Sequence, residues 1–353
     1  MTSILDVARR AHVSPATVSR VLSDANHAVS AATRARVLHA AEELDFVPNA
    51  LARGLLKSRL PIAGVIVHDI TDPYFAEVTR GVEDAATRSG YLVITCSSDR
   101  DPGRELSYIR LLRSMRAAAV VFAGSGIVDA ELDRQVQRQL TAMRGYAAAV
   151  VHLSPHAGGE PTVGIDNAGG VASMMRALIE LGHQRIAFLA GPSNLYVNHE
   201  RLAGYRAGLA DAGIAYDPQL VVESGFDASG GATAVDRLME RDSNVTAIAC
   251  SNDLLAIGAH QRLAELRIRV PDDVSLAGFD DIPVASRVAP SLSSVRVPLH
   301  ELGYLGFRHA ERALAGHRPR RRTLPTEVIL RESTAPPAGS RRPPSEPSRL
   351  VTA

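Results

Sequence analysis

The chain contains no tryptophan, one lysine and only two cysteines, Cys96 and Cys250. Two cysteines at this spacing provide neither a disulfide framework nor a cysteine-based zinc cluster. No apolar run approaches the roughly 18 residues of a transmembrane helix. Asp6, Arg9 and Arg10 interrupt the start of the chain, which therefore lacks the apolar core of a secretory signal. These shortages exclude a disulfide-rich secreted protein and a membrane-spanning protein, and they predict a cytoplasmic protein in a reducing environment.

The composition is that of an ordinary globular protein, with 46% hydrophobic and 22% charged residues in 353. This length predicts about two domains. Nearly all basic residues are arginine, so arginine content alone does not indicate nucleic-acid binding. The distribution of charge is more informative, because residues 1–60 carry eight Lys/Arg and five Asp/Glu, a net charge of +3, whereas the remainder carries −2. A basic head on a slightly acidic body indicates an end that faces nucleic acid.

Local signals near the N-terminus predict three short helices. Ser3 and Asp6 have the spacing of a capping box, which starts a helix directly after Ser3. Ser14 is a good N-cap and Pro15 suits the first helical position, so a second helix begins there. We expect helices at about 4–11, 15–22 and 31–44, with Leu5, Ala8, Val18, Val21, Leu22, Val37, Leu38, Ala41 and Leu44 facing inward.

The first two predicted helices are joined by a short turn and fit a helix-turn-helix. In that motif the N-terminal residues of the second helix meet base edges in the major groove. Arg20 has the paired donors that recognise guanine, and the Ala16 methyl group suits a thymine methyl group. Ser14, Thr17 and Ser19 suit phosphates, which position a protein without specifying sequence. The alternative is a three-helix bundle whose polar faces are only solvated.

The string from Ile4 to Leu22, ILDVARRAHVSPATVSRVL, resembles the headpiece of LacI–GalR family transcription regulators. The resemblance continues through Val29-Ser30 and Phe46–Leu55 and covers the body to about Thr334. It implies an N-terminal all-α helix-turn-helix headpiece and an α/β two-lobed effector domain of the periplasmic-binding-protein-like type I fold. It also implies a DNA-binding regulator rather than an enzyme. On this basis the expected DNA-binding residues are Ser3, Ser14, Pro15, Ala16, Thr17, Ser19, Arg20 and Leu55.

Residues 48–60 form a linker that we expect to be a conditional helix. Asn49 follows Pro48 and provides a cap for about two helical turns, which are marginal alone in water. Gly54 costs such a helix roughly another 1 kcal/mol relative to alanine. The resemblance implies a hinge helix that pairs with its dimer mate in the minor groove, where a leucine at the position of Leu55 wedges between base pairs. The alternative is that Leu55 and Leu56 pack on the body.

From Pro61 onward, short apolar runs alternate with helical periodicity, which predicts doubly wound parallel sheets in two similar lobes. The runs lie at about 62–67, 91–95, 118–122, 147–152, 185–190, near 220, 245–250 and 274–278. The helices lie at about 74–89, 104–115, 167–181, 200–212, 229–240 and 252–266. We expect a head at 1–47, the linker at 48–60, an effector-binding and dimerisation domain at 61–334 and a disordered tail at 335–353. The N-lobe would comprise about 61–160 and 293–322, and the C-lobe about 161–292 and 323–334.

Polar and aromatic side chains follow the predicted strands, at the carboxyl ends where open α/β sheets bind ligands. They are His68, Asp69, Tyr74, Phe75, Ser97, Ser98, Arg100, His152, Arg201, Asn252, Asp253 and Asp280. Aromatic faces together with Arg, Asn and Asp suit a polar, neutral, ring-shaped ligand such as a sugar or nucleoside. The alternatives are that Asp253 only caps a helix and that Asp69 caps a turn. His68 and His152 could be satisfied core histidines, and Tyr74 and Phe75 could be core residues.

The family resemblance narrows this set through the motifs DPYF (72–75), RLAGY (201–205), SND (251–253) and GFDD (278–281). It implies that Arg201, Asn252 and Asp280 clamp vicinal hydroxyl groups. The expected effector-binding residues are Tyr74, Phe75, Arg100, His152, Arg201, Phe226, Asn252 and Asp280. The loop 193–199 carries Leu195, Tyr196 and Val197 and is more apolar than in family members that bind charged ligands. It adds no extra basic residue for a phosphate or carboxylate, which argues against a phosphorylated or acidic effector, although Arg100 leaves that class open.

The remaining expectations concern assembly and competing classes. Residues 335–353 contain five prolines, typical of a disordered tail, and lack the leucine heptads of a tetramerising coiled coil. We expect a homodimer whose two heads bind a pseudo-palindromic double-stranded DNA operator, with no cofactor, metal or membrane. An effector between the lobes would shift their closure, as an inducer or a corepressor. A solute-binding protein without a regulatory role is the alternative. A dinucleotide enzyme is disfavoured because Gly124-Ser-Gly126 lacks the third glycine.

Overall fold

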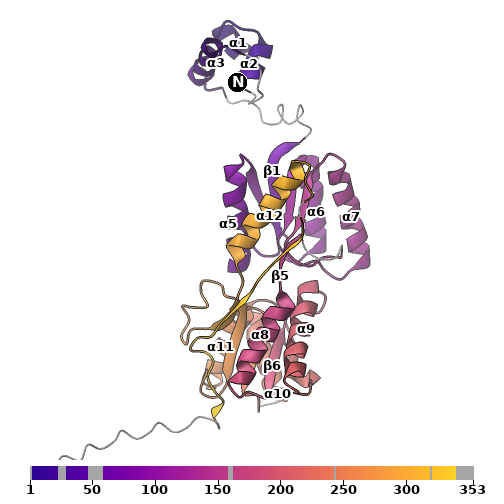
Figure 1. The fold of residues 1–353 in the computed structure, drawn as a ribbon, viewed down its shortest axis with the longest axis vertical. Coiled ribbons are helices and arrows are strands. Elements are labelled where there is room, and N and C mark those ends of the chain that lie inside the picture. Colours follow the sequence, from indigo (N-terminus) through magenta and orange to yellow (C-terminus); the bar gives the residue numbers. More distant parts are fainter. Residues whose placement is uncertain are drawn as a thin grey trace, which may run out of the picture.

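The computed structural model describes residues 2–22, 29–46, 59–157, 162–241, 244–318 and 320–338. The first helices, α1 (Ile4–Arg10), α2 (Pro15–Leu22) and α3 (Ala31–Glu43), form the head (Figure 1). Val7, Val18 and Val37 from the three helices meet in its core without exposed surface. The predicted helices are confirmed to within about a residue. The predicted hinge and Leu55 lie outside the described residues.

Two inward-facing assignments in the head are wrong. Leu5 is 58% exposed and Leu38 is 47% exposed. Both helices are apolar on more than one side, and the side that is buried is chosen by the partner helices. The face that α1 buries is centred on Val7 and Ala8, and a helix turns 100° per residue, so Leu5 points away from that face.

The first lobe is built on β1 (Leu60–Val67), β2 (Leu92–Ser97), β3 (Ala117–Phe122) and β4 (Ala149–His152), in the order β2-β1-β3-β4 and all parallel. Its helices are α5 (Pro73–Arg88), α6 (Pro102–Ser114), α7 (Ala130–Arg144) and α12 (Leu299–Leu314). Figure 1 shows α5 with α12 and α6 with α7. Val65 belongs to the core shared with α5 and α12, and Ile66 to the core shared with α6 and α7. The sheet is therefore buried on both faces, as parallel sheets require.

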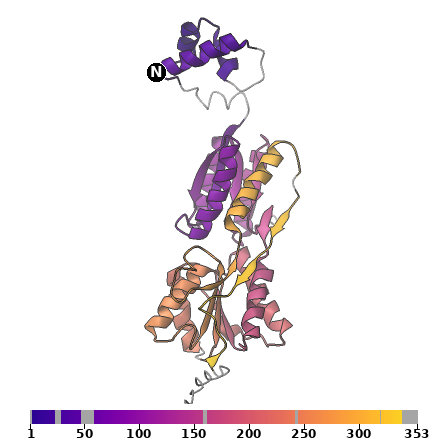
Figure 2. The same ribbon diagram turned by 60° about the vertical axis from the view of Figure 1, so that its left-hand side comes forward.

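The second lobe contains a six-stranded sheet of order β12-β10-β9-β8-β6-β7, in which β12 is antiparallel to β10. Its strands are β6 (Ile186–Ala190), β7 (Val221–Glu223), β8 (Ala247–Cys250), β9 (Ser275–Asp280), β10 (Ser293–Arg296) and β12 (Glu327–Ile329). Its helices are α8 (Asn167–Glu180), α9 (Tyr196–Asp211), α10 (Ala228–Arg241) and α11 (Asp253–Glu265). Figure 2 shows the sheet between the pair α8 and α9 and the pair α10 and α11. The predicted alternation of strands and helices is confirmed.

Three segments connect the lobes. The chain leaves the first lobe through β5 (Val163–Ile165), which pairs with β11 (Arg322–Leu324). It returns between β10 and α12 and leaves again between β11 and β12. We expected the return at about residue 293, but β10 pairs with β9 and belongs to the second sheet. Sheet pairing over long sequence separations sets this boundary, which local periodicity does not report.

Further differences concern α7, α12 and the C-terminus. The sequence patterns predict no helix at α7, whose buried apolar residues are only Val136, Leu140 and Met143, and none at α12. The predicted tail begins too early, because the backbone oxygen of Ala335 accepts a hydrogen bond from Ser275 Oγ at 2.9 Å. The rest of that prediction, from residue 339, lies outside the described residues. No helix in the described ranges is both long and apolar enough to cross a membrane.

Candidate functional site

The second helix of the head starts at a well-formed cap. Ser14 Oγ accepts a hydrogen bond from the backbone N–H of Thr17 at 3.1 Å and lies 2.9 Å from Thr17 Oγ1. Pro15 follows as the first helical residue, where its missing N–H costs nothing. Local chemistry therefore fixes where α2 begins, and with it which side chains form its exposed first turn.

The predicted DNA-reading residues of α2 share one outward face. Ser14, Pro15, Ala16 and Arg20 are exposed, Thr17 and Ser19 are half-buried, and Val18 and Val21 are buried on the opposite side. Ser3 differs, because its backbone N–H and its hydroxyl both donate to the Asp6 carboxylate, at 2.9 and 2.7 Å. These bonds lower the pKa of Asp6. In the structure, Ser3 starts α1.

A cavity with about 430 Å³ of empty space lies between the lobes. It is lined by residues that follow β1, β2, β3 and β4 of the first lobe and β6, β7, β8 and β9 of the second, so it lies at the carboxyl ends of both parallel sheets. We call it the inter-lobe cavity. Its lining residues are His68, Asp72, Tyr74, Phe75, Arg100, Ala123, Gly124, Ser125, Ser154, Leu195, Val197, Arg201, Phe226, Asn252 and Asp280.

Arg201 is the most tightly held side chain of the second-lobe wall. Its Nε donates to Asn167 Oδ1 at 3.0 Å, its Nη1 to the backbone oxygen of Ser251, and its Nη2 to Asp280 Oδ1 at 3.0 Å. The guanidinium carbon lies 4.0 Å from the ring centroid of Phe279. Since the side chain is almost fully buried, its charge and orientation are fixed before any ligand arrives.

Asp280 ends β9 with a φ of 106°, a left-handed conformation that side chains rarely adopt. Its carboxylate is buried beside Arg201. Burial raises the pKa of Asp280 to about 7, against the opposing effect of Arg201 and with a smaller contribution from Asp72. The described contacts engage only Oδ1, so Oδ2 remains available to a partner in the cavity.

Asn252, not Asp253, caps α11. Asn252 Oδ1 accepts from the backbone N–H of Leu255, and its Nδ2 donates to the backbone oxygen of Phe226, both at 3.0 Å. This arrangement ties the loop carrying Phe226 to the start of α11. The expectation that Asp253 is only a cap is wrong, because its carboxylate accepts from Ser294 Oγ and from the backbone N–H of Ile282.

The first-lobe wall is aromatic with one carboxylate. Asp72 caps α5 by accepting from the backbone N–H of Tyr74 at 2.9 Å, and burial raises its pKa. The rings of Tyr74 and Phe75 meet edge to face at a centroid distance of 5.0 Å. Burial, with the nearby positive charge of Arg100, lowers the pKa of His68 to about 3. His68 is therefore a neutral ring at physiological pH.

Arg100 connects the two walls. It follows β2 with a φ of 58°, and its guanidinium carbon lies 5.7 Å from the ring centroid of Phe226 in the other lobe. Its Nε is buried and, within the described residues, has no hydrogen-bond partner. Because an unpaired buried donor is costly, this atom favours a ligand that presents an acceptor.

His152 does not line the inter-lobe cavity. Its ring stacks on Phe122 at 4.8 Å and lies 4.4 Å from the ring of His156. Phe122 belongs to the core beneath α6 and α7, so the side chain of His152, the last residue of β4, points to that face of the sheet. Burial lowers its pKa well below the usual value. The structure therefore does not bring His152 together with the other predicted effector residues, because strand alternation places its side chain on the other face.

The remaining predicted effector residues all line the inter-lobe cavity: Tyr74, Phe75, Arg100, Arg201, Phe226, Asn252 and Asp280. The predicted effector residues do not include Asp72, Ser125 and Ser154, which also line the cavity. Asp72 lies within the DPYF motif, and the two serines lie just after β3 and β4, so strand-end position was the available signal. In the described part of the chain, no three His, Cys, Asp or Glu side chains are arranged to hold a metal ion.

Residues 3–49 match the family described as bacterial regulatory proteins, lacI family, and residues 175–334 match a periplasmic binding protein-like domain. The transcriptional regulator DegA of Bacillus subtilis is 31% identical over 342 residues, which are 95% of this chain and 98% of DegA. The chain belongs to the LacI family.

Other LacI-family relatives are similar in sequence over most of the chain. The transcriptional repressor CytR of Escherichia coli K12 is 34% identical over 84% of this chain and 85% of its own. The solved complex of the transcriptional regulator CelR with cellobiose is 30% identical, covers 94% of this chain and all of its own, and has a TM-score of 0.68. As a LacI-family member, the protein is a sequence-specific DNA-binding transcription regulator and not an enzyme.

Proposed function

We propose that the protein is a repressor whose affinity for its operator is set by a small, neutral, polyhydroxylated ligand in the inter-lobe cavity. A sugar or a nucleoside fits this description. The observation that carries the proposal is the buried pair of Arg201 and Asp280, which presents fixed donors and an open carboxylate oxygen at the cavity wall.

Arg201 and Asp280 together suit adjacent hydroxyl groups. A guanidinium has five N–H donors, and the protein uses three of them. The remaining N–H groups of Arg201 can donate to the oxygen of a ligand hydroxyl group. Asp280 Oδ2 can accept a hydrogen bond from the same or the neighbouring hydroxyl group. Such charge-assisted hydrogen bonds are the stronger ones. Neither donation by Arg201 nor acceptance by Asp280 requires the ligand to carry a charge.

The charges around the cavity favour a neutral ligand. Arg100 and Arg201 are balanced by Asp72 and Asp280. The other walls are apolar or aromatic and suit the faces of a ring, with Tyr74, Phe75, Leu195, Val197 and Phe226. Arg100 then receives an uncharged acceptor, such as a ring or carbonyl oxygen. The cellobiose held by the related CelR supports a sugar as the ligand class.

On the DNA side, we assign base reading to Arg20 and Ala16 and phosphate positioning to Ser14, Thr17 and Ser19, with Pro15 packing at the helix start. Their common outward face at the start of α2, opposite the buried Val18 and Val21, supports this assignment. Ser3 supports α1, and Leu55, in the proposed hinge at 48–60, is assigned the minor-groove wedge.

We propose a homodimer that reads a pseudo-palindromic operator, since two heads related by a two-fold axis require two half-sites. Within the described residues, β2 is the edge strand of the first-lobe sheet, which supports this assembly. Leu92 at one end of β2 is 64% exposed, and Ile70, whose backbone N–H donates to Ser97 at the other end, is 56% exposed. A second copy of the chain would cover these apolar side chains.

Ligand binding would act by a population shift. A ligand that contacts both walls favours closed lobes, which changes the spacing of the two hinge segments in the dimer and their fit to DNA. We place this activity in the cytoplasm, where operator DNA is found. A corepressor reverses the sign, because closed lobes would then favour the operator.

The deciding experiment combines two measurements on the full-length protein. Random duplex DNA is selected at a stated salt concentration, because affinity depends on it. In parallel, a panel of sugars and nucleosides is tested for a rise in melting temperature. Enrichment of a two-fold symmetric site, released by a panel compound, supports the inducer mechanism. Enrichment only with the compound supports corepression, and failure to find any symmetric site contradicts the DNA-binding assignment.

A further inference from the structure

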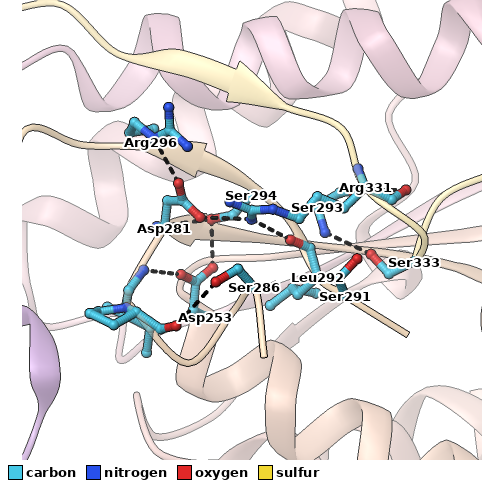
Figure 3. A network of polar contacts seen from close by, with 12 residues as sticks. Asp253, Asp281, Ser286, Ser291, Leu292, Ser293, Ser294, Arg296, Arg331 and Ser333 are labelled. Carbon is cyan, nitrogen blue, oxygen red and sulfur yellow. Dashed lines mark hydrogen bonds and ion pairs between the residues drawn. The ribbon is translucent and has the colours of Figure 1, made fainter. Parts of the chain in front are cut away.

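Asp280 is followed directly by a second aspartate with a left-handed backbone, since Asp281 has a φ of 52°. Two successive non-glycine residues in this region persist only where their surroundings hold them. The side chain of Asp280 lines the inter-lobe cavity, whereas the carboxylate of Asp281 points to the network of Figure 3. The two adjacent carboxylates therefore face different parts of the protein.

The carboxylate of Asp281 forms ion pairs with two arginines. Its Oδ1 lies 2.7 Å from Arg331 Nη1, and its Oδ2 accepts from Arg296 Nε at 2.8 Å (Figure 3). The Asp281 side chain is only 6% exposed. Arg331 also donates to the backbone oxygen of Leu292 at 2.7 Å. Both oxygens of Asp281 are thus engaged, and neither is available to a ligand.

Both arginines border segments that cross between the lobes. The second crossing lies between β10 and α12, and the third lies between β11 and β12. Arg296 ends β10, and α12 of the first lobe begins at Leu299. Arg331 lies two residues after β12, the first strand after the third crossing. Arg296 also lies 3.5 Å from Glu327, which starts β12. The charges around Asp281 therefore connect the second and third crossings to the end of β9.

The buried carboxylate of Asp253 holds the backbone that follows Asp280. Ser294 Oγ donates to Asp253 Oδ1 at 2.6 Å and accepts from the backbone N–H of Asp281 at 3.0 Å. The backbone N–H of Ile282 donates to Asp253 Oδ2 at 2.8 Å. On the other side, the backbone oxygen of Asp280 accepts from the N–H of Val297, the first crossing residue, at 3.3 Å.

We infer that Asp281 is a positioning residue that sets the cavity-facing carboxylate of Asp280 and ties it to the second and third crossings. A change in the partners of Asp280 is then transmitted to the segments that must move when the lobes close. The inference rests on the proposed function for its biological meaning. Its physical content is the linkage of Asp280 to the crossings through Asp281, Arg296 and Arg331.

The test measures hydrogen–deuterium exchange of the β12 amides in the full-length protein without ligand or DNA. Four chains are compared: the native chain, Asp280→Asn, Asp281→Asn and the double variant. In the native chain we expect Asp280→Asn to change the β12 exchange rate about two- to thirtyfold, the range typical of coupled positions. In the Asp281→Asn chain we expect the same substitution to have no effect on β12.

The control is Asp273→Asn, which removes an exposed carboxylate of the same lobe whose partner is Arg269. It should leave the effect of Asp280→Asn on β12 intact. If Asp281→Asn does not fold, Arg296→Gln takes its place. The Arg296 side chain is half-exposed, and the substitution removes only one of the two arginine partners of Asp281. If Asp280→Asn does not fold, Arg201→Lys takes its place, because it alters the hydrogen bond that Arg201 donates to the Asp280 carboxylate.

Equal effects of Asp280→Asn in both backgrounds, or no effect in the native chain, would overturn the inference. A merely structural role of Asp281 would raise exchange across the second lobe and still leave those effects additive. Because neither ligand nor operator is used, this result is separate from the proposed function, which fails instead if no sugar or nucleoside binds.

Discussion

Arg201 and Asp280 lie 3.0 Å apart, Nη2 to Oδ1, in an ion pair that is almost completely buried at the wall of the inter-lobe cavity. The pair comes from α9 and from the end of β9. The guanidinium is held by Asn167 and the backbone of Ser251 as well. A site with prearranged charges loses little free energy to ordering when a ligand binds.

Asp280→Asn should weaken ligand binding about ten- to a hundredfold, because a charged acceptor contributes about 1.5–3 kcal/mol. Operator affinity without ligand is measured in parallel, because it separates the loss of a ligand contact from a shift in the lobe equilibrium. Titration calorimetry with the compound found by screening measures the first quantity and fluorescence anisotropy the second. Asp273→Asn is the matched control. Unchanged ligand affinity in Asp280→Asn would place the ligand elsewhere.

Ligand binding should also depend on pH. Burial raises the pKa of Asp280 to about 7, and a hydroxyl group that donates to the carboxylate favours its ionised form. Binding therefore releases a proton, and affinity should fall by up to about tenfold for each unit below pH 7. Titrations at pH 6, 7 and 8 measure this dependence. A native pH dependence that persisted in Asp280→Asn would assign it to another group.

The sequence was sufficient where the controlling interactions are local. Ser14 and Pro15 determine the start of α2 through a cap and a ring geometry that involve neighbouring residues only. Asp280 was predicted because the carboxyl end of a strand can be identified from the apolar run before it. The motif resemblance added Phe226, which follows a strand too short to predict well.

The sequence was insufficient where partners distant along the chain decide. His152 and Ser154 are two residues apart, and only the packing of the sheet shows that Ser154 lines the cavity. Leu5 and Leu38 are apolar but exposed, because the choice of buried face is made by the other helices. Asp281 is held by an arginine 50 positions later, and no local pattern predicts such a pair.

Arg20→Ala should weaken binding to the selected operator by about 1–3 kcal/mol, the discrimination that a bidentate arginine–guanine contact provides. Binding to random DNA should change much less, since phosphate contacts dominate there. Fluorescence anisotropy at one fixed salt concentration compares both duplexes. Arg9→Ala is the control, because Arg9 is exposed on α1 beside Asp6. Equal losses on both duplexes would make Arg20 a phosphate contact.

Leu55→Ala should reduce operator bending with a smaller loss of affinity, because a wedge residue exchanges unstacking energy for a bent duplex. This prediction comes from the sequence, since Leu55 lies outside the described residues. Energy transfer between dyes at the two operator ends reports the bend. Leu56→Ala is the neighbouring control. A bend that is unchanged in Leu55→Ala and lost in Leu56→Ala would move the wedge by one residue.

Glu105→Gln should change how stability depends on pH. Glu105 lies in α6 in a buried position, and burial, with a smaller effect of Asp133, raises its pKa to about 7. A folded-state pKa above the unfolded value means that this group stabilises the fold at low pH. That contribution is lost as pH rises towards 7, because the buried carboxylate must then ionise.

Above pH 7 the native chain carries this cost and Glu105→Gln does not. The variant should therefore be more stable than the native chain at pH 8, on the order of 1–3 kcal/mol, with little difference at pH 5. Denaturant unfolding at the two pH values gives the difference between the chains, which cancels the shared titration of His68 and His156. Glu131→Gln on α7 is the control of opposite sign, because Arg134 lowers the pKa of Glu131. A variant and a native chain with the same pH dependence would show that Glu105 ionises normally in the folded protein.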